Sequence, residues 1–376
     1  MRQIAFNTPI VTQLEQDYVR DALASPKHAG DGPFTKRCQQ FFETRYGFPK
    51  ALLTTSCTDA LELSALLLDI VPGDEVILPS FTFVSSANAF ALRGATLVFA
   101  DSEPHTPNIS VDAIEALITP QTRAIVVVHY AGVACDMDPI MALASRHDIA
   151  VVEDAAQAVD SFYKGQPLGG IGAMSAFSFH ETKNVSSGEG GLFVANDPRF
   201  FERAEILREK GTNRSSFFRG EVDKYGWVDV GSSFLPSDIL AAYLTGQLER
   251  LDTIQSRRKA IWQGYRNRLD SVAEYGVTLP HIPDYATNNA HMFYMVCDNL
   301  DQRTQLIAHL RERGILAPFH YLSLHASPYF KDRHDQRAIP NSDRYTECLM
   351  RLPLHLGLSD DDVAYVAEAV IDGLRR

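Results

Sequence analysis

A lysine with the surroundings that covalent chemistry needs stands in the segment FSFHETKN at 177–184. The apolar run at 174–178 predicts a buried strand, and Lys183 falls in the turn after it, shortly before the glycine-rich GEGG at 188–191. Removal from water lowers the pKa of an amine, and the uncharged amine can form a Schiff base with a carbonyl carbon. The alternative is a solvated surface lysine, which is the commoner role of this residue type.

Adjacent carboxylates follow another apolar run, in VVEDAAQ at 151–157. Burying a carboxylate is costly unless it has a partner. A protonated pyridine nitrogen beside Asp154 would be such a partner, and the carboxylate would keep that ring a good electron sink. The alternative is an aspartate at a strand end that caps the next helix.

Two further segments place polar and aromatic residues at the ends of predicted strands. In TTSCT at 54–58, hydroxyl groups precede a predicted helix, whose N-terminus favours an anion such as phosphate. A plain N-cap by Ser56 or Thr58 is the alternative. In PSFTFVS at 79–85, an aromatic ring could stack on a planar cofactor, although a phenylalanine in an ordinary core is commoner.

These segments need a scaffold that brings them together, and the hydrophobic pattern predicts one. Short apolar runs alternate with helical segments through about the first 200 residues, which indicates an α/β fold with a mostly parallel sheet covered on both faces. Ligands bind such a sheet beyond the carboxyl ends of its strands. The predicted strands are 51–54, 75–78, 96–100, 124–128, 149–153, 174–178 and 192–195, and the helices between them are 58–68, 86–93, 111–117 and 137–147.

The rest of the chain predicts a second, smaller domain. A capping box opens a predicted helix at 12–24. A long helix that starts at Ser237 is expected to direct its leucines toward the second domain. From about residue 256 the chain has fewer strands and more charge. We therefore divide it into a large domain at 1–255 and a smaller C-terminal α/β domain at 256–376.

Composition and motif content argue against several classes of function. A net charge of −12 argues against sequence-independent nucleic-acid binding, and no apolar run predicts a membrane span or a signal peptide. Five scattered cysteines without a CxxC pair are typical of reduced thiols in a cytoplasmic protein. His320 and His325 are poorly spaced for a shared metal, and no HExxH, P-loop, GxGxxG or GxSxG motif occurs, so we expect no metal site.

Taken together and in this order, the four segments resemble the DegT family of nucleotide-sugar aminotransferases, which have the aspartate-aminotransferase fold (fold type I). The resemblance runs from Phe6 to PLH at 353–355 and is most specific at 153–157 and 178–191. It implies pyridoxal phosphate (PLP) as the cofactor. By this resemblance Lys183 joins the cofactor, Asp154 pairs with its ring nitrogen, Gln157 lies near its ring oxygen, Phe83 stacks on the ring, and Cys57, Thr58 and Ser178 bind its phosphate.

Two positions depart from the family pattern. Cys57 stands where glycine is usual, so we expect only its backbone N–H to meet the phosphate. Ser233 stands where many members have an asparagine that reaches the phosphate from the partner subunit, and the shorter serine would need a bridging water. The family also implies a homodimer with shared active sites.

The resemblance suggests residues that meet the substrates. Arg214, Arg219 and Tyr225 lie in a polar loop, where an arginine fork would suit a phosphate or a carboxylate, with a solvated surface loop as the alternative. His320 and Tyr321 match contacts on the sugar side, with ordinary packing between domains as the alternative.

The implied activity is transfer of an amino group from L-glutamate to a nucleotide-linked keto sugar, with Lys183 as general base and then acid. A 4-keto-6-deoxy sugar on dTDP is favoured by the resemblance of segments such as FHETKN and DVGSSFLPSD. A 3-keto sugar is the alternative acceptor. A sugar dehydratase of the same fold would carry histidine in place of Lys183, and a non-catalytic sensor would not need the full set of cofactor residues.

Overall fold

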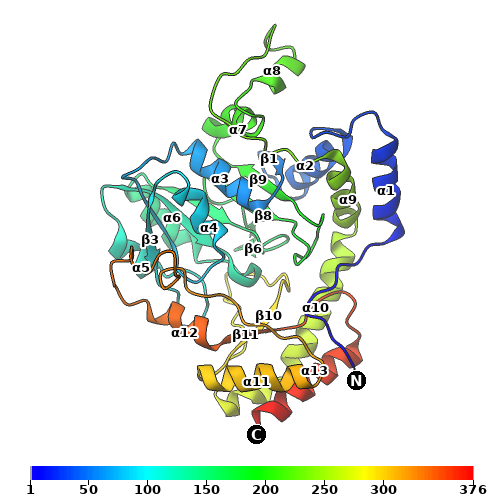
Figure 1. Ribbon diagram of the computed structural model, residues 1–376, viewed down its shortest axis with the longest axis vertical. Coiled ribbons are helices and arrows are strands. Elements are labelled where there is room, and N and C mark those ends of the chain that lie inside the picture. The colour runs from blue at the N-terminus through cyan, green and yellow to red at the C-terminus, as the bar shows by residue number, and fades with distance from the viewer. Residues whose placement is uncertain (1, 376) are drawn as a thin grey trace.

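A seven-stranded sheet forms the centre of the computed structural model, which describes residues 2–375 (Figure 1). Its strands lie in the order β1-β9-β8-β5-β4-β2-β3. Within the sheet only β9 runs against its neighbours, so the predicted mostly parallel sheet is confirmed. The strands are β1 (Lys50–Thr54), β2 (Glu75–Pro79), β3 (Thr96–Ala100), β4 (Thr122–Val128), β5 (Ala150–Asp154), β8 (Met174–Ser178) and β9 (Gly191–Ala195).

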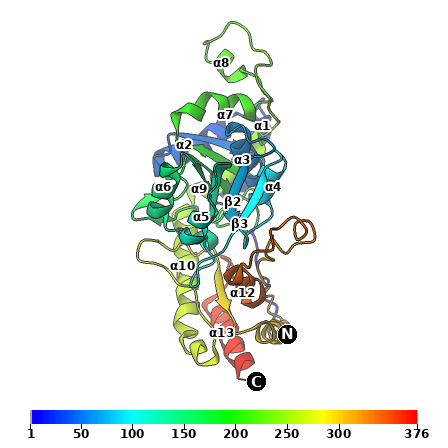
Figure 2. The same cartoon turned by 90° about the vertical axis from the view of Figure 1, so that its left-hand side faces the viewer.

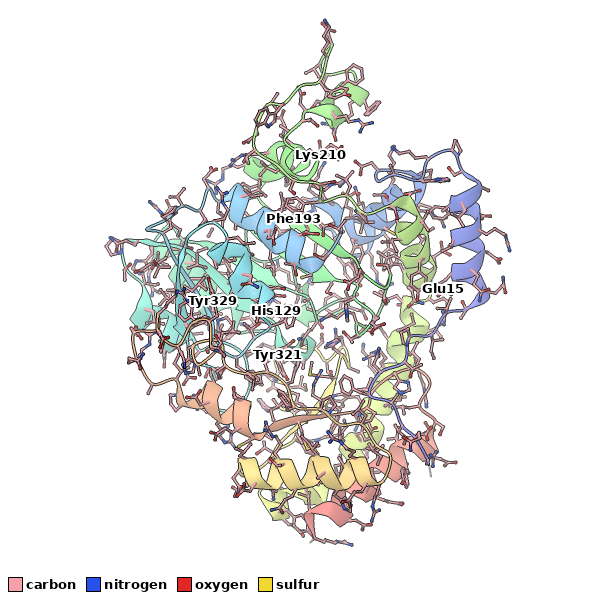
Figure 3. All side chains as sticks on the ribbon, viewed as in Figure 1. Glu15, His129, Phe193, Lys210, Tyr321 and Tyr329 are labelled. Carbon is pink, nitrogen blue, oxygen red and sulfur yellow. The ribbon has the colours of Figure 1, made fainter. Side chains whose placement is uncertain are left out.

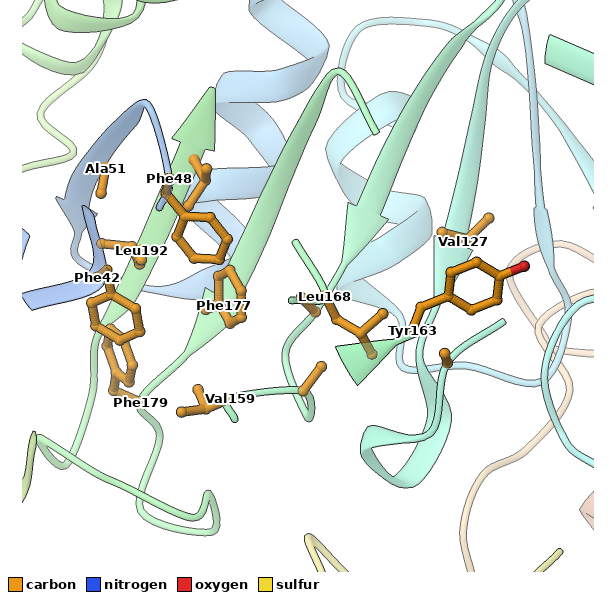
Figure 4. Packing of buried hydrophobic residues seen from close by; sticks show 14 of the residues in the cluster. Phe42, Phe48, Ala51, Val127, Val159, Tyr163, Leu168, Phe177, Phe179 and Leu192 are labelled. Carbon is orange, nitrogen blue, oxygen red and sulfur yellow. The ribbon is translucent and has the colours of Figure 1, made fainter. Parts of the chain in front are cut away.

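Helices cover both faces of this sheet because its strands are apolar on both sides. In β5, Val151 joins one hydrophobic cluster and Val152 the other, as alternation along a strand requires. Figure 4 shows the first cluster, in which Phe42 and Phe177 pack together. That face is covered by α1 (Gln13–Ala24), α2 (Pro33–Tyr46), α5 (Val111–Leu117), α6 (Met137–Arg146) and α9 (Asp238–Glu249), and the other by α3 (Cys57–Leu67), α4 (Ser85–Ala91) and α7 (Phe201–Arg208).

The C-terminal part of the chain lies beneath this body in Figure 1 and has a hydrophobic cluster of its own. Ile4 from the N-terminal segment joins that cluster and forms a bridge with Ile315. The part consists of α10 (Leu251–Arg268), α11 (Leu300–Glu312), α12 (Pro340–Cys348), α13 (Asp360–Leu374) and an antiparallel pair of strands, β10 (Phe293–Val296) and β11 (Leu349–Leu352).

Helix α10 is continuous across the proposed boundary at residue 255. Ile254 packs in the core of the large body, whereas Ile261 and Tyr265 pack in the core of the C-terminal part. The helix predicted from Ser237 is present as α9, capped by that serine. The expected direction of its leucines was wrong, because residues such as Leu244 enter the core of the large body against α1 and α2.

Short elements complete the fold. They are the strands β6 (Phe162–Tyr163) and β7 (Gln166–Pro167), the helix α8 (Arg214–Phe218) and the 3-10 turns η1 (Tyr130–Gly132), η2 (Pro198–Phe200) and η3 (Asp270–Tyr275). Among residues 2–375 no helix has the length and apolar character that crossing a bilayer demands.

An arm at residues 211–236, which contains α8, projects from the end of the body away from the C-terminal part (Figures 1 and 2). Its two branches meet tightly at the base, where a Cβ on Gly231 would lie 2.0 Å from the nitrogen of Gly211. A bridge between Thr212 and Trp227 joins the branches further along. Glycine is therefore required where the arm leaves the body.

The buried carboxylate of Glu153 fixes the loop that leads from β5 toward β8. It accepts hydrogen bonds from the backbone N–H groups of Gly169 (2.7 Å), Ile171 (2.8 Å) and Gly172 (2.6 Å). His129 contributes a fourth, from Nε2 at 2.9 Å, because its Nδ1 accepts the N–H of Cys135 and Nε2 therefore carries the proton. These partners compensate the cost of burying this charge.

We expect Glu153→Gln to lower the free energy of unfolding by about 3 kcal/mol, since the amide cannot accept all four hydrogen bonds of a buried carboxylate. Urea denaturation measures the change. Glu115→Gln is the control, because that exposed carboxylate pairs only with Arg146 at the surface. Equal stability of the two variants would show that the Glu153 carboxylate does not stabilise this loop.

Candidate active site

A cavity of about 660 Å³ opens at the carboxyl ends of the parallel strands, where the large body meets the C-terminal part. Figure 3 places Tyr321 in this region, below His129 and above the C-terminal helices. Among the residues predicted from the sequence to be functional, the cavity brings together Cys57, Thr58, Phe83, Asp154, Gln157, Ser178, Lys183, His320 and Tyr321.

Lys183 stands half-buried on the cavity wall, in the turn after β8, where its N–H donates to the carbonyl of His180 at 2.9 Å. Burial lowers the pKa of its amine below 10.5, and the positive charge of Arg351 acts in the same direction. The negative charge of Asp154 opposes this shift without cancelling it. Lys183 therefore has the depressed pKa that a nucleophilic amine needs.

Asp154, at the end of β5, is buried and has two hydrogen-bond donors. Ser86 Oγ donates at 2.6 Å to one carboxylate oxygen, and the N–H of Ala156 donates at 3.1 Å to the other. Burial nevertheless raises the pKa of this carboxyl above 3.8. A carboxylate in this state gains from a cationic partner, and the ring nitrogen of a pyridinium would provide one.

The wall next to Asp154 is a chain of polar and aromatic contacts. The N–H of Ala131 donates to Gln157 Oε1 at 2.6 Å, which directs Gln157 Nε2 toward the hydroxyl of Tyr321 at 3.3 Å. The Tyr321 ring lies 6.1 Å from the ring of Phe83. Phe83 is 55% exposed, so it remains available for stacking, whereas Phe81 is the phenylalanine of this segment that enters the core.

The N-terminus of α3 forms another wall, next to Lys183. Ser56 caps the helix by accepting the N–H of Asp59 at 3.1 Å, so the capping alternative is confirmed for this residue. Thr58 Oγ1 lies 2.7 Å from the hydroxyl of Ser85. Burial raises the pKa of the Cys57 thiol, which therefore stays uncharged and does not repel an anion at the helix terminus.

Gly191 explains why glycines follow Lys183 so closely. A Cβ at this position would lie 2.3 Å from the carbonyl carbon of Ser56 and 2.5 Å from the nitrogen of Cys57. Only glycine allows the start of β9 to approach the first turn of α3 this closely. The glycine-rich segment thus helps to hold the helix terminus against the start of β9, which pairs with β8, the strand that precedes Lys183.

The predicted residues of the arm do not reach the cavity within one chain. Arg219 is held by Glu205 at 2.8 Å and by Glu221 at 2.7 Å. Arg214 lies over the ring of Tyr225 at 6.0 Å, and Ser233 is exposed near the base of the arm. Their roles toward phosphate or substrate remain predictions that require a second subunit.

Sequence reasoning missed three residues that the structure places at the site. Ser86 holds Asp154, while His291 and Arg351 line the cavity from the C-terminal part. Ser86 directly follows a segment that was singled out for its aromatic residues, so a hydroxyl one residue further on was the available signal. His291 and Arg351 lie in the segments AHMFY and MRLPL, and neither segment contains a motif that would mark these residues as functional.

His291 is fixed in one tautomer. Its Nδ1 lies 2.8 Å from Asn184 Oδ1, and Asn184 Nδ2 donates to Gln255 and to the carbonyl of Asn289. Asn184 Oδ1 is therefore an acceptor, so His291 Nδ1 carries the proton. Burial keeps the pKa of this imidazole well below 6.5, and Nε2 remains an acceptor. The network also anchors Asn184, the residue next to Lys183.

Comparison with models of known protein families identifies the family to which this chain belongs. The model of the DegT/DnrJ/EryC1/StrS aminotransferase family matches residues 9–371. This chain belongs to that family. The spore coat polysaccharide biosynthesis protein SpsC of Bacillus subtilis is 34% identical over 378 residues, which cover 98% of this chain and 96% of SpsC.

Solved structures of family members have the same fold. The putative sugar aminotransferase Spr1654 from Streptococcus pneumoniae in its PMP form is 29% identical and superposes with a TM-score of 0.92, covering 100% of this chain and 98% of its own. The aminotransferase TlmJ from Streptoalloteichus hindustanus is 32% identical with a TM-score of 0.92, covering 100% and 99%. The predicted fold-type I architecture is therefore confirmed.

The predicted cofactor is also confirmed, because aminotransferases of this family use PLP and Spr1654 has been solved in both PLP and PMP forms. The cavity fits this group. Burial disfavours the charge of Asp154, so that this carboxylate gains from a cationic ring. Burial also lowers the pKa of the Lys183 amine, which faces the same space, and the N-terminus of α3 suits a phosphate. In the part of the chain that the structure describes, no group of three or more histidine, cysteine, aspartate or glutamate residues could hold a metal ion.

The depressed pKa of Lys183 gives a testable pH dependence. The reactive form is the neutral amine, which predominates above the pKa, so a lowered pKa extends reactivity to lower pH. We expect cofactor-free protein to join PLP at a rate that rises with pH to a midpoint below 10.5. Stopped-flow absorbance measures this rate, and Lys183→Ala is the blank. A midpoint at or above 10.5 would contradict the assignment of a desolvated amine.

Proposed function

We propose that this enzyme transfers the amino group of L-glutamate to a nucleotide-linked 4-keto-6-deoxy sugar, with dTDP-4-keto-6-deoxyglucose as the favoured acceptor. The observation that carries the proposal is one cavity, in a chain of this aminotransferase family, that is lined by Lys183, Asp154 and the N-terminus of α3. The names of SpsC and Spr1654, which refer to polysaccharide biosynthesis and to a sugar aminotransferase, support a sugar acceptor.

The assignment of the acceptor sugar rests on the sequences of particular segments. Segments such as FHETKN and GTNRSSFFRGEVDKYGW resemble dTDP-4-amino-4,6-dideoxygalactose transaminase, which supplies an aminosugar for enterobacterial common antigen. The product would accordingly be a 4-amino sugar for a cell-surface polysaccharide. A 3-keto sugar remains the alternative acceptor.

Lys183 and Asp154 have different parts in the proposed mechanism. PLP, when bound, supplies a carbonyl carbon to which amines attach and a ring that withdraws electrons from the bond being broken. Lys183 would hold the cofactor through its amine, and the same amine, once free, would take the proton from the α-carbon of glutamate as a general base. Asp154 would pair with the ring nitrogen, and its negative charge would keep that ring electron-withdrawing. With the keto sugar bound, Lys183 returns a proton in the reverse direction.

The remaining cavity residues orient the reactants and limit water. Gln157 and Tyr321 form a hydrogen-bonded wall, and His320 Nδ1 lies 3.1 Å from the hydroxyl of Tyr130. Burial keeps the pKa of His320 well below 6.5, so its imidazole is neutral and can exchange hydrogen bonds with sugar hydroxyls. We assign Tyr321 and His320 to the sugar side of the site.

A panel of nucleotide-linked keto sugars, incubated with the holoenzyme and glutamate, tests the acceptor. We expect amine at C4 of the dTDP-linked sugar, identified by NMR of the product. Amine at C3 would replace the 4-keto assignment by the 3-keto alternative. Loss of a sugar hydroxyl without gain of nitrogen would make the protein a dehydratase, and absence of any turnover would favour a sensor.

Replacement of the proposed catalytic lysine tests the mechanism. We expect Lys183→Ala to lose turnover by at least about 10⁴-fold while keeping its fold, because both the attachment point and the base are removed. Lys164→Ala is the matched control, since that exposed lysine pairs with Asp138 at the surface. Peptide mapping after borohydride reduction should place the phosphopyridoxyl group on Lys183. A tag on another lysine would overturn the assignment.

We also propose a homodimer in which the arm of one subunit completes the site of the other. The arm carries exposed apolar side chains, with Trp227 84% and Phe218 70% exposed. Such a patch on a projecting segment is costly in water and is typical of a surface that another chain covers. Arg214 and Ser233 would reach phosphate or substrate from this position, as the family resemblance implies.

Charged substitutions in the arm test this assembly. We expect Phe218→Lys with Trp227→Lys to weaken the dimer by at least about 30-fold, because aromatic residues dominate interface energies. Sedimentation velocity measures the dissociation, and turnover should fall with it. Leu92→Lys is the control, since Leu92 is also 70% exposed but lies outside the arm. Unchanged sedimentation of the arm variant would exclude the arm from the interface.

A further inference from the structure

A second cavity, of about 700 Å³, lies apart from the candidate active site and shares no lining residue with it among residues 2–375. It opens where the loop after β3, with Pro104 and His105, meets α10, β10 and α12 of the C-terminal part. Its volume is in the range of sites that hold a small molecule. The amino transfer proposed above takes place in the other cavity, so this space has no part in the chemistry.

Four basic side chains from separate segments line this second cavity. Arg266 is half-buried on α10 and Arg344 is exposed on α12, while His105 and His281 are exposed on loops. In the part of the chain that the structure describes, neither guanidinium forms an ion pair within 4.0 Å or a side-chain hydrogen bond. Asp270 is the one acidic side chain among the described lining residues, and it pairs with neither arginine. An anion in this cavity would therefore meet donors that no protein group already occupies.

The floor of the second cavity is apolar. Aliphatic and aromatic side chains form it, namely Val277, Leu279, Pro280, Tyr294, Val296 and Tyr345. The hydroxyl of Tyr345 donates to the carbonyl of Glu103 at 2.9 Å, which fixes this wall to the loop after β3. An apolar floor below a cationic rim suits a molecule that joins a ring system to an anionic group.

A nucleoside phosphate has this combination of groups. Arginine forks bind phosphate oxygens in pairs, and the base and sugar would cover the apolar floor. Asp270 would repel the phosphates, but it can accept hydrogen bonds from a sugar hydroxyl or a base N–H. Inorganic phosphate alone would occupy a small part of the volume and leave the floor in contact with water.

One layer of aromatic rings separates the second cavity from the active site. Tyr294 packs edge-to-face on Tyr130, with ring centres 5.6 Å apart, and the hydroxyl of Tyr130 lies 3.1 Å from His320 Nδ1. His320 lines the active-site cavity. A ligand that moves Tyr294 would therefore shift the surroundings of His320 through a single intervening ring.

Another chain of ring contacts joins the same two cavities. The centre of the Tyr345 ring lies 5.7 Å from that of Phe81, and the Phe81 ring lies 5.9 Å from the ring of Tyr321. Tyr321 lines the active-site cavity, as His320 does. Both chains of contacts thus end at the residues that we assign to the sugar.

We propose that the second cavity binds a nucleoside phosphate and transmits its occupancy to the sugar side of the active site. The binding site goes beyond the proposed function, whereas the effect on turnover rests on it. The probe is dTDP, because the favoured acceptor carries this nucleotide.

Calorimetry with dTDP tests the binding site. We expect the holoenzyme to bind two equivalents per chain, one in each cavity, and Arg266→Met with Arg344→Met to weaken one of them by at least about 30-fold. Arg268→Met with Arg311→Met is the matched control, since these exposed arginines of α10 and α11 lie outside the cavity and the change in charge is the same. Thymidine, which lacks the phosphates, should not show the second equivalent. Equal losses in both double variants, or dTDP binding that the cavity variant leaves unchanged, would overturn the site.

Turnover at saturating sugar nucleotide tests the effect on the active site, because excess acceptor keeps dTDP out of that cavity. We expect dTDP to change kcat by at least about twofold in the unmodified enzyme but not in the variant with Arg266→Met and Arg344→Met, whose kcat without dTDP should be normal. An unchanged kcat in the unmodified enzyme would overturn the coupling through the aromatic layer. Failure to aminate any nucleotide-linked keto sugar would instead refute the proposed function, and the loss of dTDP binding in the cavity variant would still establish the second site.

Discussion

The chemistry of this site depends on withdrawing one amine and one carboxyl from water within the same cavity. Burial lowers the pKa of Lys183 and raises that of Asp154, so each is pushed toward its uncharged form. Their mutual attraction opposes both shifts without abolishing either. For the proposed mechanism, this shift brings Lys183 closer to its nucleophilic form and leaves Asp154 with a charge that a cationic ring would stabilise. The sheet makes this possible, because the turns after two parallel strands end at the same edge.

The two adjacent carboxylates of β5 show how alternation along a strand separates structure from function. Glu153 and Asp154 point to opposite faces, and their surroundings differ accordingly. Glu153 is surrounded by backbone N–H groups and by His129, which compensate its charge permanently. Asp154 has only Ser86 and the N–H of Ala156. The same pair of residue types therefore yields a structural carboxylate and one that is available to a ligand.

The sequence predicted the parts of the site that are local in the chain. A strand followed by a turn made Lys183 and Asp154 candidates, because consecutive residues show both the buried strand and its end. The family resemblance then implied their roles. Arg351 and His291 could not be found in this way, since Asn184, which binds His291, and Phe6, which lies under Arg351, are more than a hundred residues away in the chain. The direction of the α9 leucines failed for the same reason, because a helical pattern shows that a face is apolar but not which core receives it.

Helix α10 is one continuous helix that packs in the cores of both the large body and the C-terminal part. Its first turns are embedded among residues of the large body, and its later turns belong to the interior of the C-terminal half. No loop interrupts the chain at residue 255. Ile4, near the N-terminus, also packs in the hydrophobic cluster of the C-terminal part. A rigid-body movement of the C-terminal part toward the large body would accordingly tilt this helix. Severing the chain after residue 255 would fray the helix and expose apolar surface on both fragments.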